Sequence, residues 1–149
     1  MPNATVQSTP LRAMRLAARV VAAAALAVDA YYHAKLADQY DLVSKSVSEG
    51  DLFRVEAGLA SLAALLLLIW HRLPSEIFAW LVAAGGLAAV LVYRYIDVGT
   101  LGPLPNMYEP VWFQDKRLSA LSQAIALVAV TFLLVTGRHE RSRARRHLH

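Results

Sequence analysis

The fold of this chain is decided by residues 52–96, LFRVEAGLASLAALLLLIWHRLPSEIFAWLVAAGGLAAVLVYRYI, which hold two long apolar runs around one short polar connection. Each run, Leu52–Trp70 and Ile77–Ile96, approaches the roughly 20 residues that an apolar helix needs to cross a hydrocarbon core about 30 Å thick. Between the runs, Pro74 and Ser75 break helical continuity, since proline lacks an amide hydrogen and serine prefers helix caps. The stretch predicts a tight antiparallel helical hairpin in a membrane.

Two further apolar segments, Leu16–Leu36 and Leu118–Thr136, flank this hairpin. The 149 residues are 57% hydrophobic and only 17% charged, which is more apolar surface than one soluble core of that size needs. We therefore predict an all-α fold, a four-helix transmembrane bundle over residues 11–137, in a multi-pass protein of the cell membrane. Residues 1–10 are predicted to be a disordered arm, and residues 138–149 a basic cytoplasmic tail.

The charges of the connecting pieces differ between the two predicted sides of the membrane. Nine of the 15 Lys and Arg fall in the N-terminal part, the connection at Arg72 and the tail, with only Glu76 and Glu140 against them. The other side holds six bases and nine acids. Because positively charged connections stay in the cytoplasm, both termini are predicted to be cytoplasmic. The bilayer is the expected partner, with anionic headgroups at the tail, and nucleic acid is not expected.

The first apolar segment leaves an alternative open. Its uncharged run is only Val20–Val28 before Asp29 interrupts it. Residues 12–28 therefore also fit the positive and apolar regions of a cleavable signal peptide, with small residues nearby for the cleavage site. The helical pattern continues through Tyr31 and Tyr32, and aromatic residues at that depth match an interfacial belt. A retained first helix is the preferred interpretation.

Several kinds of chemistry find no support in the composition. The chain contains no cysteine, which excludes thiol and disulfide chemistry, including that of a quinone-linked disulfide oxidoreductase. Of the five histidines only His33 falls on the predicted outer side, and no histidine pair has the spacing of a metal site. We therefore assign no metal, no cofactor and no catalytic residue, and we do not expect an enzyme.

Polar and ionisable residues gather near the outer ends of the four segments. Asp29 and His33 are four residues apart, hence on one helix face, and Lys116 begins a polar stripe with helical spacing on the last segment. Since charges near hydrocarbon are costly, such placement indicates either function or pairing. An outward-facing pocket is predicted, with the candidate residues Asp29, His33, Arg54, Glu56, Arg94, Asp97, Ser119, Ser122 and Gln123. The competing interpretation is structural, with interhelical ion pairs, hydrogen bonds and snorkelling side chains.

The connection between the third and fourth segments, residues 97–113, is predicted to cover this pocket. Its glycines and prolines prevent a regular helix, yet it is too apolar for a freely solvated loop. As a lid it would turn Tyr108, Glu109 and Trp112 toward the helices. The alternative is an interfacial anchor that places Trp112 among the lipid headgroups.

Three stretches carry a resemblance: the run from His33 to Tyr40, the sequence Gly50–Phe53, and the outer loop Gly102–Pro105, which leads to Trp112. Together they resemble uncharacterised small four-span bacterial integral membrane proteins, and the layout is also similar to that of DoxX-like proteins. The resemblance covers most of residues 29–135. It implies the fold and the outer pocket but no reaction, and this chain departs from it in having Gln123 where the relatives carry an acid.

Three functions fit these observations. The first is a small polytopic membrane protein whose outer pocket binds a small molecule, lipid or quinone. The second is an accessory or assembly subunit of a larger membrane complex, with no activity of its own. The third is a transporter or proton-conducting unit that uses Asp29, His33 and Glu56 as a relay. The third is the least favoured, since the inner halves of the apolar segments offer few polar groups.

Overall fold

A computed structural model describes residues 8–146 of the chain. Its long helices are α1 (Ser8–Ala37), α2 (Glu49–Ile69), α3 (Leu73–Tyr95) and α4 (Gln114–Arg146), and the short 3-10 helix η1 (Asp38–Tyr40) follows α1. No strand occurs in the described part. The all-α prediction is confirmed, and each of the four predicted segments corresponds to one long helix.

Two helices extend beyond their predicted segments. Helix α1 begins at Ser8, so residues 8–10 of the predicted arm are helical, while residues 1–7 lie outside the described residues. Helix α4 continues to Arg146 and so includes most of the predicted basic tail, of which residues 147–149 lie outside the description. Local hydropathy could not locate these ends, because the added turns are polar.

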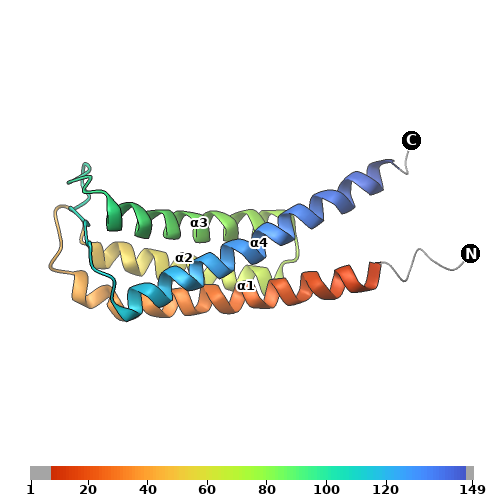
Figure 1. Cartoon of the computed structure of the whole chain (residues 1–149), viewed down its shortest axis with the longest axis horizontal. Coiled ribbons are helices and arrows are strands. Elements are labelled where there is room, and N and C mark those ends of the chain that lie inside the picture. Colours follow the sequence, from red (N-terminus) through yellow and green to blue (C-terminus); the bar gives the residue numbers. More distant parts are fainter. Residues whose placement is uncertain (1–7, 147–149) are drawn as a thin grey trace, which may run out of the picture.

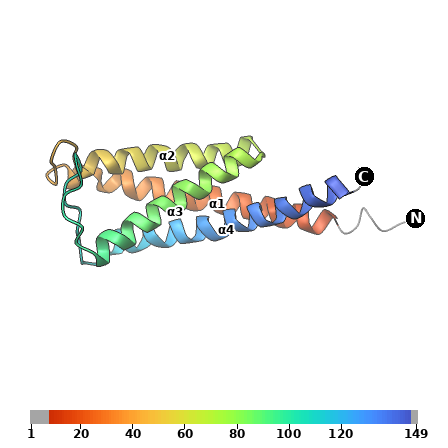
Figure 2. The same cartoon turned by 90° about the horizontal axis from the view of Figure 1, so that it is seen from above.

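The four helices pack side by side, with α1 against α2 and α4, and α3 against α4 and α2. Figure 1 shows that α1 begins and α4 ends at the same end of the molecule, opposite the two long connections. Seen from above, α2 and α3 diverge from their short connection, and α3 crosses over to lie along α4 at the far end (Figure 2). We call the end with the two long connections the loop end.

The core between the helices is built largely from alanine. Leu26 and Ala22 of α1 are fully buried, as are Ala79 and Ala83 of α3. Small side chains let helix backbones approach closely, which is how helices associate where no water is present to drive them together. Ala79 and Ala83 therefore mark the face of α3 that packs inward.

Helices α2, α3 and α4 are long and apolar enough to cross a membrane. Helix α1 is not in that set, because charged side chains interrupt its apolar run. Two of those charges are turned inward: Arg19 is 5% exposed and Asp29 is 0% exposed. Apolar side chains of α2, such as Leu62 and Leu65, are exposed instead. The molecule thus buries charge and exposes hydrocarbon, the arrangement expected of a protein surrounded by lipid.

Side-chain hydrogen bonds stabilise the starts of α2 and α3. The Ser48 hydroxyl accepts a hydrogen bond from the Asp51 amide at 3.0 Å and caps the start of α2. In the connection to α3, the Ser75 hydroxyl donates to the carbonyls of Trp70 and Arg72 at 2.6 and 2.7 Å. These bonds satisfy backbone groups that a helix end leaves free, and they make the turn tight.

Candidate functional site

A cavity of about 230 Å³ lies at the loop end, in the space between α2 and α3. Gly85 and Ala89 of α3 line it and are exposed, so the cavity opens along the side of the molecule. Side chains from all four helices and the last long connection contribute: His33, Leu36, Tyr40, Glu49, Leu52, Phe53, Glu56, Gly85, Gly86, Ala89, Val90, Tyr93, Met107, Glu109, Phe113, Lys116 and Ser119.

The base of this cavity is formed by His33, Glu56 and Ser119, and behind them lies Asp29, whose side chain is fully buried and does not line the cavity. The Ser119 hydroxyl of α4 donates to Asp29 Oδ1 at 2.9 Å. His33 Nδ1 lies 3.0 Å from the same oxygen, one helical turn along α1. The prediction that these outer polar residues join across helices is therefore confirmed.

Helix α2 and helix α3 complete the cluster with Glu56 and Gly86. Glu56 lines the cavity beside His33 and Ser119. A Cβ atom on Gly86 would lie 2.7 Å from Glu56 Oε1 and would also collide with the Gln123 amide. Glycine here leaves room for both side chains against the α3 backbone, and a larger residue would have to displace their ends.

Ser122 and Gln123 follow Ser119 on the buried face of α4. Ser122 is 5% exposed, and its hydroxyl donates to the Ser119 carbonyl at 2.7 Å, within its own helix. Gln123 is fully buried beside Gly86. The predicted polar stripe of α4 thus exists and faces the other helices, with Ser119 lining the cavity itself.

Several polar atoms of the cluster have no hydrogen-bond partner among the described residues. They are Asp29 Oδ2, Glu56 Oε1 and both amide atoms of Gln123. A buried polar atom without a partner costs free energy, and such atoms are rare in folded proteins. Three of these four atoms are acceptors, and of their residues Glu56 lines the cavity while Asp29 and Gln123 lie behind the lining.

The mouth of the cavity holds a second polar group around Glu109. The Tyr40 hydroxyl donates to Glu109 Oε2 at 2.6 Å, and Lys116 Nζ donates to the Glu109 carbonyl at 2.9 Å. Burial, followed by the bond to Glu109, raises the pKa of the Tyr40 phenol. Tyr40 therefore keeps its proton and remains a donor.

Two mouth residues were missed by the sequence prediction. Tyr40 is the last residue of η1 and Glu49 the first residue of α2, and both line the cavity. Glu49 is only 6% exposed. An acid at the start of a helix is ordinarily explained by the helix dipole, so its burial left no signal in the sequence. Tyr40 belongs to one of the stretches that carry the family resemblance, but no spacing pattern in the sequence marked it as a site residue.

The prediction that Arg54 joins the pocket is wrong. Its guanidinium bonds Asp38 and Asp41, each at 2.8 Å, on the exposed surface of the first long connection. Arg54 and Glu56 are two residues apart, and residues at that spacing point to different faces of a helix. The Arg54 guanidinium also holds the pKa of the Asp41 carboxyl below its usual value.

Arg94 and Asp97 also lie apart from the polar cluster. Asp97 follows the end of α3 and accepts hydrogen bonds from the Gly99 amide at 3.1 Å and from Asn106 at 3.0 Å, so it shapes the loop. The Arg94 guanidinium lies 4.8 Å from the Tyr95 ring centroid and 5.7 Å from that of Trp112. Both residues were assigned to the pocket only from their level along the predicted helices. That level does not specify the direction of a side chain.

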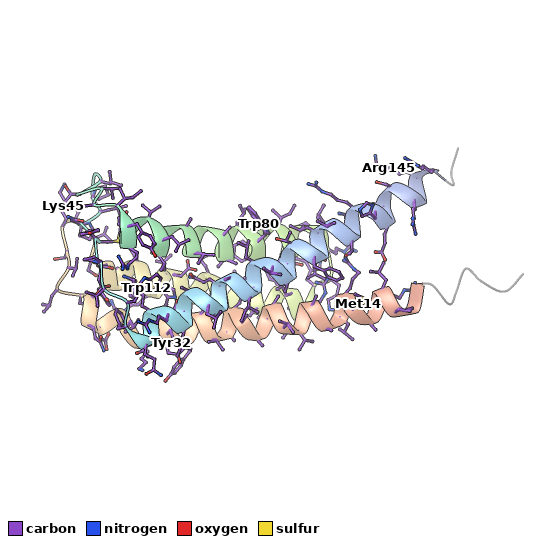
Figure 3. The ribbon with its side chains drawn as sticks, viewed as in Figure 1. Met14, Tyr32, Lys45, Trp80, Trp112 and Arg145 are labelled. Atoms are coloured by element: carbon purple, nitrogen blue, oxygen red, sulfur yellow. The ribbon has the colours of Figure 1, made fainter. Side chains whose placement is uncertain are left out.

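The predicted lid covers the cavity only in part. Met107, Glu109 and Phe113 line the cavity, which confirms Glu109. Tyr108 is 40% exposed and does not line it, so the prediction for this residue is wrong. Trp112 lies at the loop end, together with Lys45 of the other connection (Figure 3). Its ring centroid is 5.8 Å from Lys116 Nζ, so Trp112 stacks behind the lining rather than within it.

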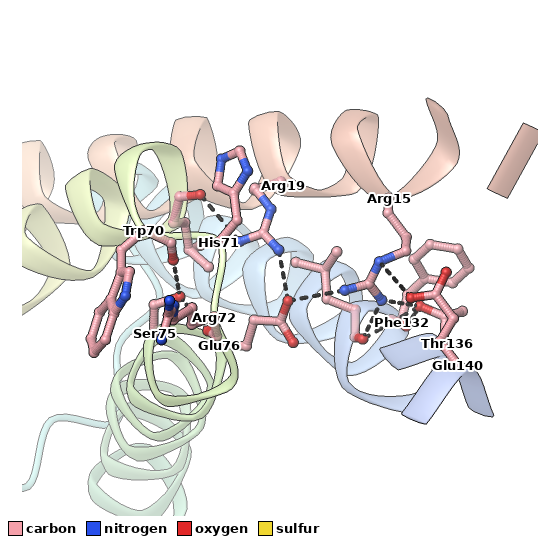
Figure 4. Close-up of polar contacts among 12 residues, drawn as sticks. Arg15, Arg19, Trp70, His71, Arg72, Ser75, Glu76, Phe132, Thr136 and Glu140 are labelled. Atoms are coloured by element: carbon pink, nitrogen blue, oxygen red, sulfur yellow. Dashed lines mark hydrogen bonds and ion pairs between the residues drawn. The ribbon is translucent and has the colours of Figure 1, made fainter. Parts of the chain in front are cut away.

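The opposite end of the molecule holds a buried ion cluster that the sequence prediction did not include. Glu76 of α3, 2% exposed, receives hydrogen bonds from Arg19 at 2.7 Å and from Arg15 at 3.1 Å (Figure 4). Arg15 also donates to the Leu133 carbonyl at 2.6 Å. These charges had been used only to predict orientation, whereas the structure uses them to join α1, α3 and α4.

These features define an all-helical protein with three helices able to cross a membrane, a cavity at the loop end and a buried ion cluster at the other. Comparison with known proteins gives no match: no family model, curated protein or solved structure is similar to the chain. Among the described residues, no group of three or more His, Cys, Asp or Glu is placed to hold a metal ion.

Proposed function

We propose that this protein is a multi-pass protein of the cell membrane, a four-helix transmembrane bundle with both termini in the cytoplasm. In this proposal the cavity at the loop end faces outward and binds a small molecule, with lipid and quinone as the membrane-borne candidates. The observation that carries it is the set of buried polar atoms without partners at the base of a cavity with largely apolar walls. Ligand sites combine these two properties.

The transmembrane position of α1 is supported by the direction of its charges. Arg19 and Asp29 are buried against the other helices, so α1 would not expose them to lipid. Arg19 pairs with Glu76 of α3 and Asp29 bonds Ser119 of α4, which fits a retained helix better than a cleaved signal peptide. The orientation rests on the excess of basic residues at the end where α1 begins and α4 ends.

Orientation is tested by labelling single cysteines. Because the chain has no cysteine, Ser46→Cys, Thr100→Cys and Ser142→Cys each carry one thiol, and all three positions are exposed. On intact cells an impermeant maleimide is expected to label Ser46→Cys and Thr100→Cys but not Ser142→Cys. Labelling of Ser142→Cys alone would reverse the orientation. A mature protein that begins after Ala27 or Ala30 would show that the first segment is cleaved.

Ligand binding is tested by blocking the cavity. The protein is purified in mild detergent, and its bound small molecules and proteins are identified by native mass spectrometry. Wild type and Leu91→Trp, whose residue is exposed on α3 outside the cavity, are expected to retain the same molecule. Ala89→Trp is expected to lose it, since the indole enters the cavity space. A wild type that carries a stoichiometric partner protein and no small molecule would favour the accessory subunit instead.

Transport by a single copy has weaker support. A relay between the two polar ends must cross the stretch of α1 between Arg19 and Asp29. The buried residues there are alanine and leucine, among them Ala22 and Leu26, which hold no proton and bind no ion. Ion or proton paths need polar groups throughout.

A further inference from the structure

We propose that the cavity selects a small organic cation, an amphiphile with a primary ammonium group and a compact apolar body. This inference rests on the proposed function and specifies the ligand class of the same site. It follows from the charge of the lining, from the free acceptors at its base and from the shape of the walls.

The charge of the lining is acidic. Glu49, Glu56 and Glu109 line the cavity, against Lys116 as the single lining lysine or arginine. Lys116 and Tyr40 already pair with Glu109. Glu49 and Glu56 therefore have no lysine or arginine of their own in the lining, and Asp29 adds a third carboxyl directly beneath. Among the lining residues only His33 and Lys116, which Glu109 shares, can balance these three, so the site holds more carboxyls than basic groups.

The hydrogen-bonding groups at the base point to the same class of ligand. Glu56 lines the cavity and its Oε1 is an acceptor without a partner, and two further acceptors without partners, Asp29 Oδ2 and Gln123 Oε1, are buried behind the lining. A primary ammonium offers three donors and no acceptor, so it can satisfy acceptors while compensating negative charge. An unpaired buried carboxylate is costly, and a bound cation relieves that cost.

The same reasoning disfavours the other ligand classes. A quinone presents carbonyl oxygens, which only accept hydrogen bonds, to a base that is itself rich in acceptors. An anionic lipid headgroup would meet the uncompensated carboxyls and be repelled. The walls instead suit an apolar body: Phe53, Tyr93 and Phe113 line the cavity with aromatic rings, which also attract cations. A volume of about 230 Å³ limits that body to a single ring or a short chain.

The test compares three probes of one shape and different charge. The full-length protein is placed in phosphatidylcholine nanodiscs and titrated by calorimetry with 2-phenylethylamine, 2-phenylethanol and 3-phenylpropionate, with empty nanodiscs as the partition control. The amine is expected to bind at least roughly tenfold more tightly than the alcohol, because charge-assisted hydrogen bonds are about twice as strong as neutral ones. The carboxylate is expected not to bind.

Two variants locate the amine site. Glu56→Gln keeps the shape but removes one charge, and is expected to weaken amine binding roughly tenfold while leaving alcohol binding unchanged. Asp51→Asn, which removes an exposed carboxylate outside the cavity, is the charge control. Gly86→Ala displaces Glu56 and Gln123 and is expected to weaken amine binding, whereas Gly58→Ala, where an added Cβ contacts nothing, is not. If Glu56→Gln does not fold, the comparison of Gly86→Ala with Gly58→Ala still tests the proposal.

Each other outcome overturns the cation proposal. Equal affinity for amine and alcohol, tighter binding of the carboxylate, or no binding of any probe would each do so. So would amine binding that Glu56→Gln and Gly86→Ala both leave unchanged. The proposed function is judged separately, by the molecule retained in wild type and lost in Ala89→Trp, and it stands if that molecule is neutral.

Discussion

Glu76→Gln is expected to lower the free energy of unfolding by about 3 to 5 kcal/mol, because it leaves buried arginine charge without its counter-charge. Glu76 and Arg19 are 2% and 5% exposed, and their ion pair measures 2.7 Å. The same carboxylate oxygen also pairs with Arg15 at 3.1 Å. The measurement is reversible unfolding in mixed micelles with increasing denaturing detergent, followed by circular dichroism.

Glu140→Gln is the matched control for this prediction. Glu140 lies 4.0 Å from Arg15, but its side chain is 50% exposed, so the change is expected to cost about 0 to 1 kcal/mol. The double variant Arg19→Met/Glu76→Met is expected to recover part of the lost stability, since it removes the buried Arg19 charge together with its partner, while Arg15 still lacks Glu76. Equal midpoints for Glu76→Gln and Glu140→Gln would contradict the buried cluster.

Gly50→Ala is expected to destabilise the protein by about 1 to 3 kcal/mol, through overpacking at the close contact between the end of α1 and the start of α2. Gly50 is buried, and a Cβ there would collide with the Ala37 carbonyl oxygen and with the Asp41 carboxyl. The backbone oxygen cannot swing aside as a flexible side chain can. Thermal unfolding in detergent measures the effect.

Gly58→Ala provides the comparison within the same helix. An added Cβ at Gly58 contacts nothing, so the change is expected to stabilise α2 by up to about 1 kcal/mol through helix propensity alone. The two glycine variants should therefore shift the melting temperature in opposite directions. A Gly50→Ala variant as stable as Gly58→Ala would show that the two helices do not approach as closely as described.

The helices were predictable because their signals are local. The apolar runs are properties of consecutive residues and give the long helices, and the helical chain breaks at Trp70–Arg72, just before Pro74 and Ser75 in the first turn of α3. The pairing of Asp29 with His33 was predictable for the same reason, since a four-residue spacing places two side chains on one helix face whatever surrounds them.

The candidate site was predictable only in part, because height along a helix does not determine direction. Arg54 and Glu56 occur at the same level, yet one bonds exposed acids of the connection and the other lines the cavity. Asp97 lies beyond the last turn of α3, where helical periodicity gives no direction at all. The site residues of α1 and α4, from Asp29 and His33 to Ser119 and Gln123, lie together because each set follows the periodicity of its own helix.

The sequence by itself determined the number and type of the long helices and the acid–imidazole pair of α1, since these depend on neighbours in the chain. Only the tertiary structure decided which charges are buried. Arg19 and Arg138 are the same residue type beside apolar segments, but Arg19 is buried against Glu76 while Arg138 is exposed. Likewise Gly86, rather than its exposed neighbour Gly85, admits Glu56 and Gln123. Burial depends on how helices pack across the chain, and that packing is set by contacts between residues far apart in sequence.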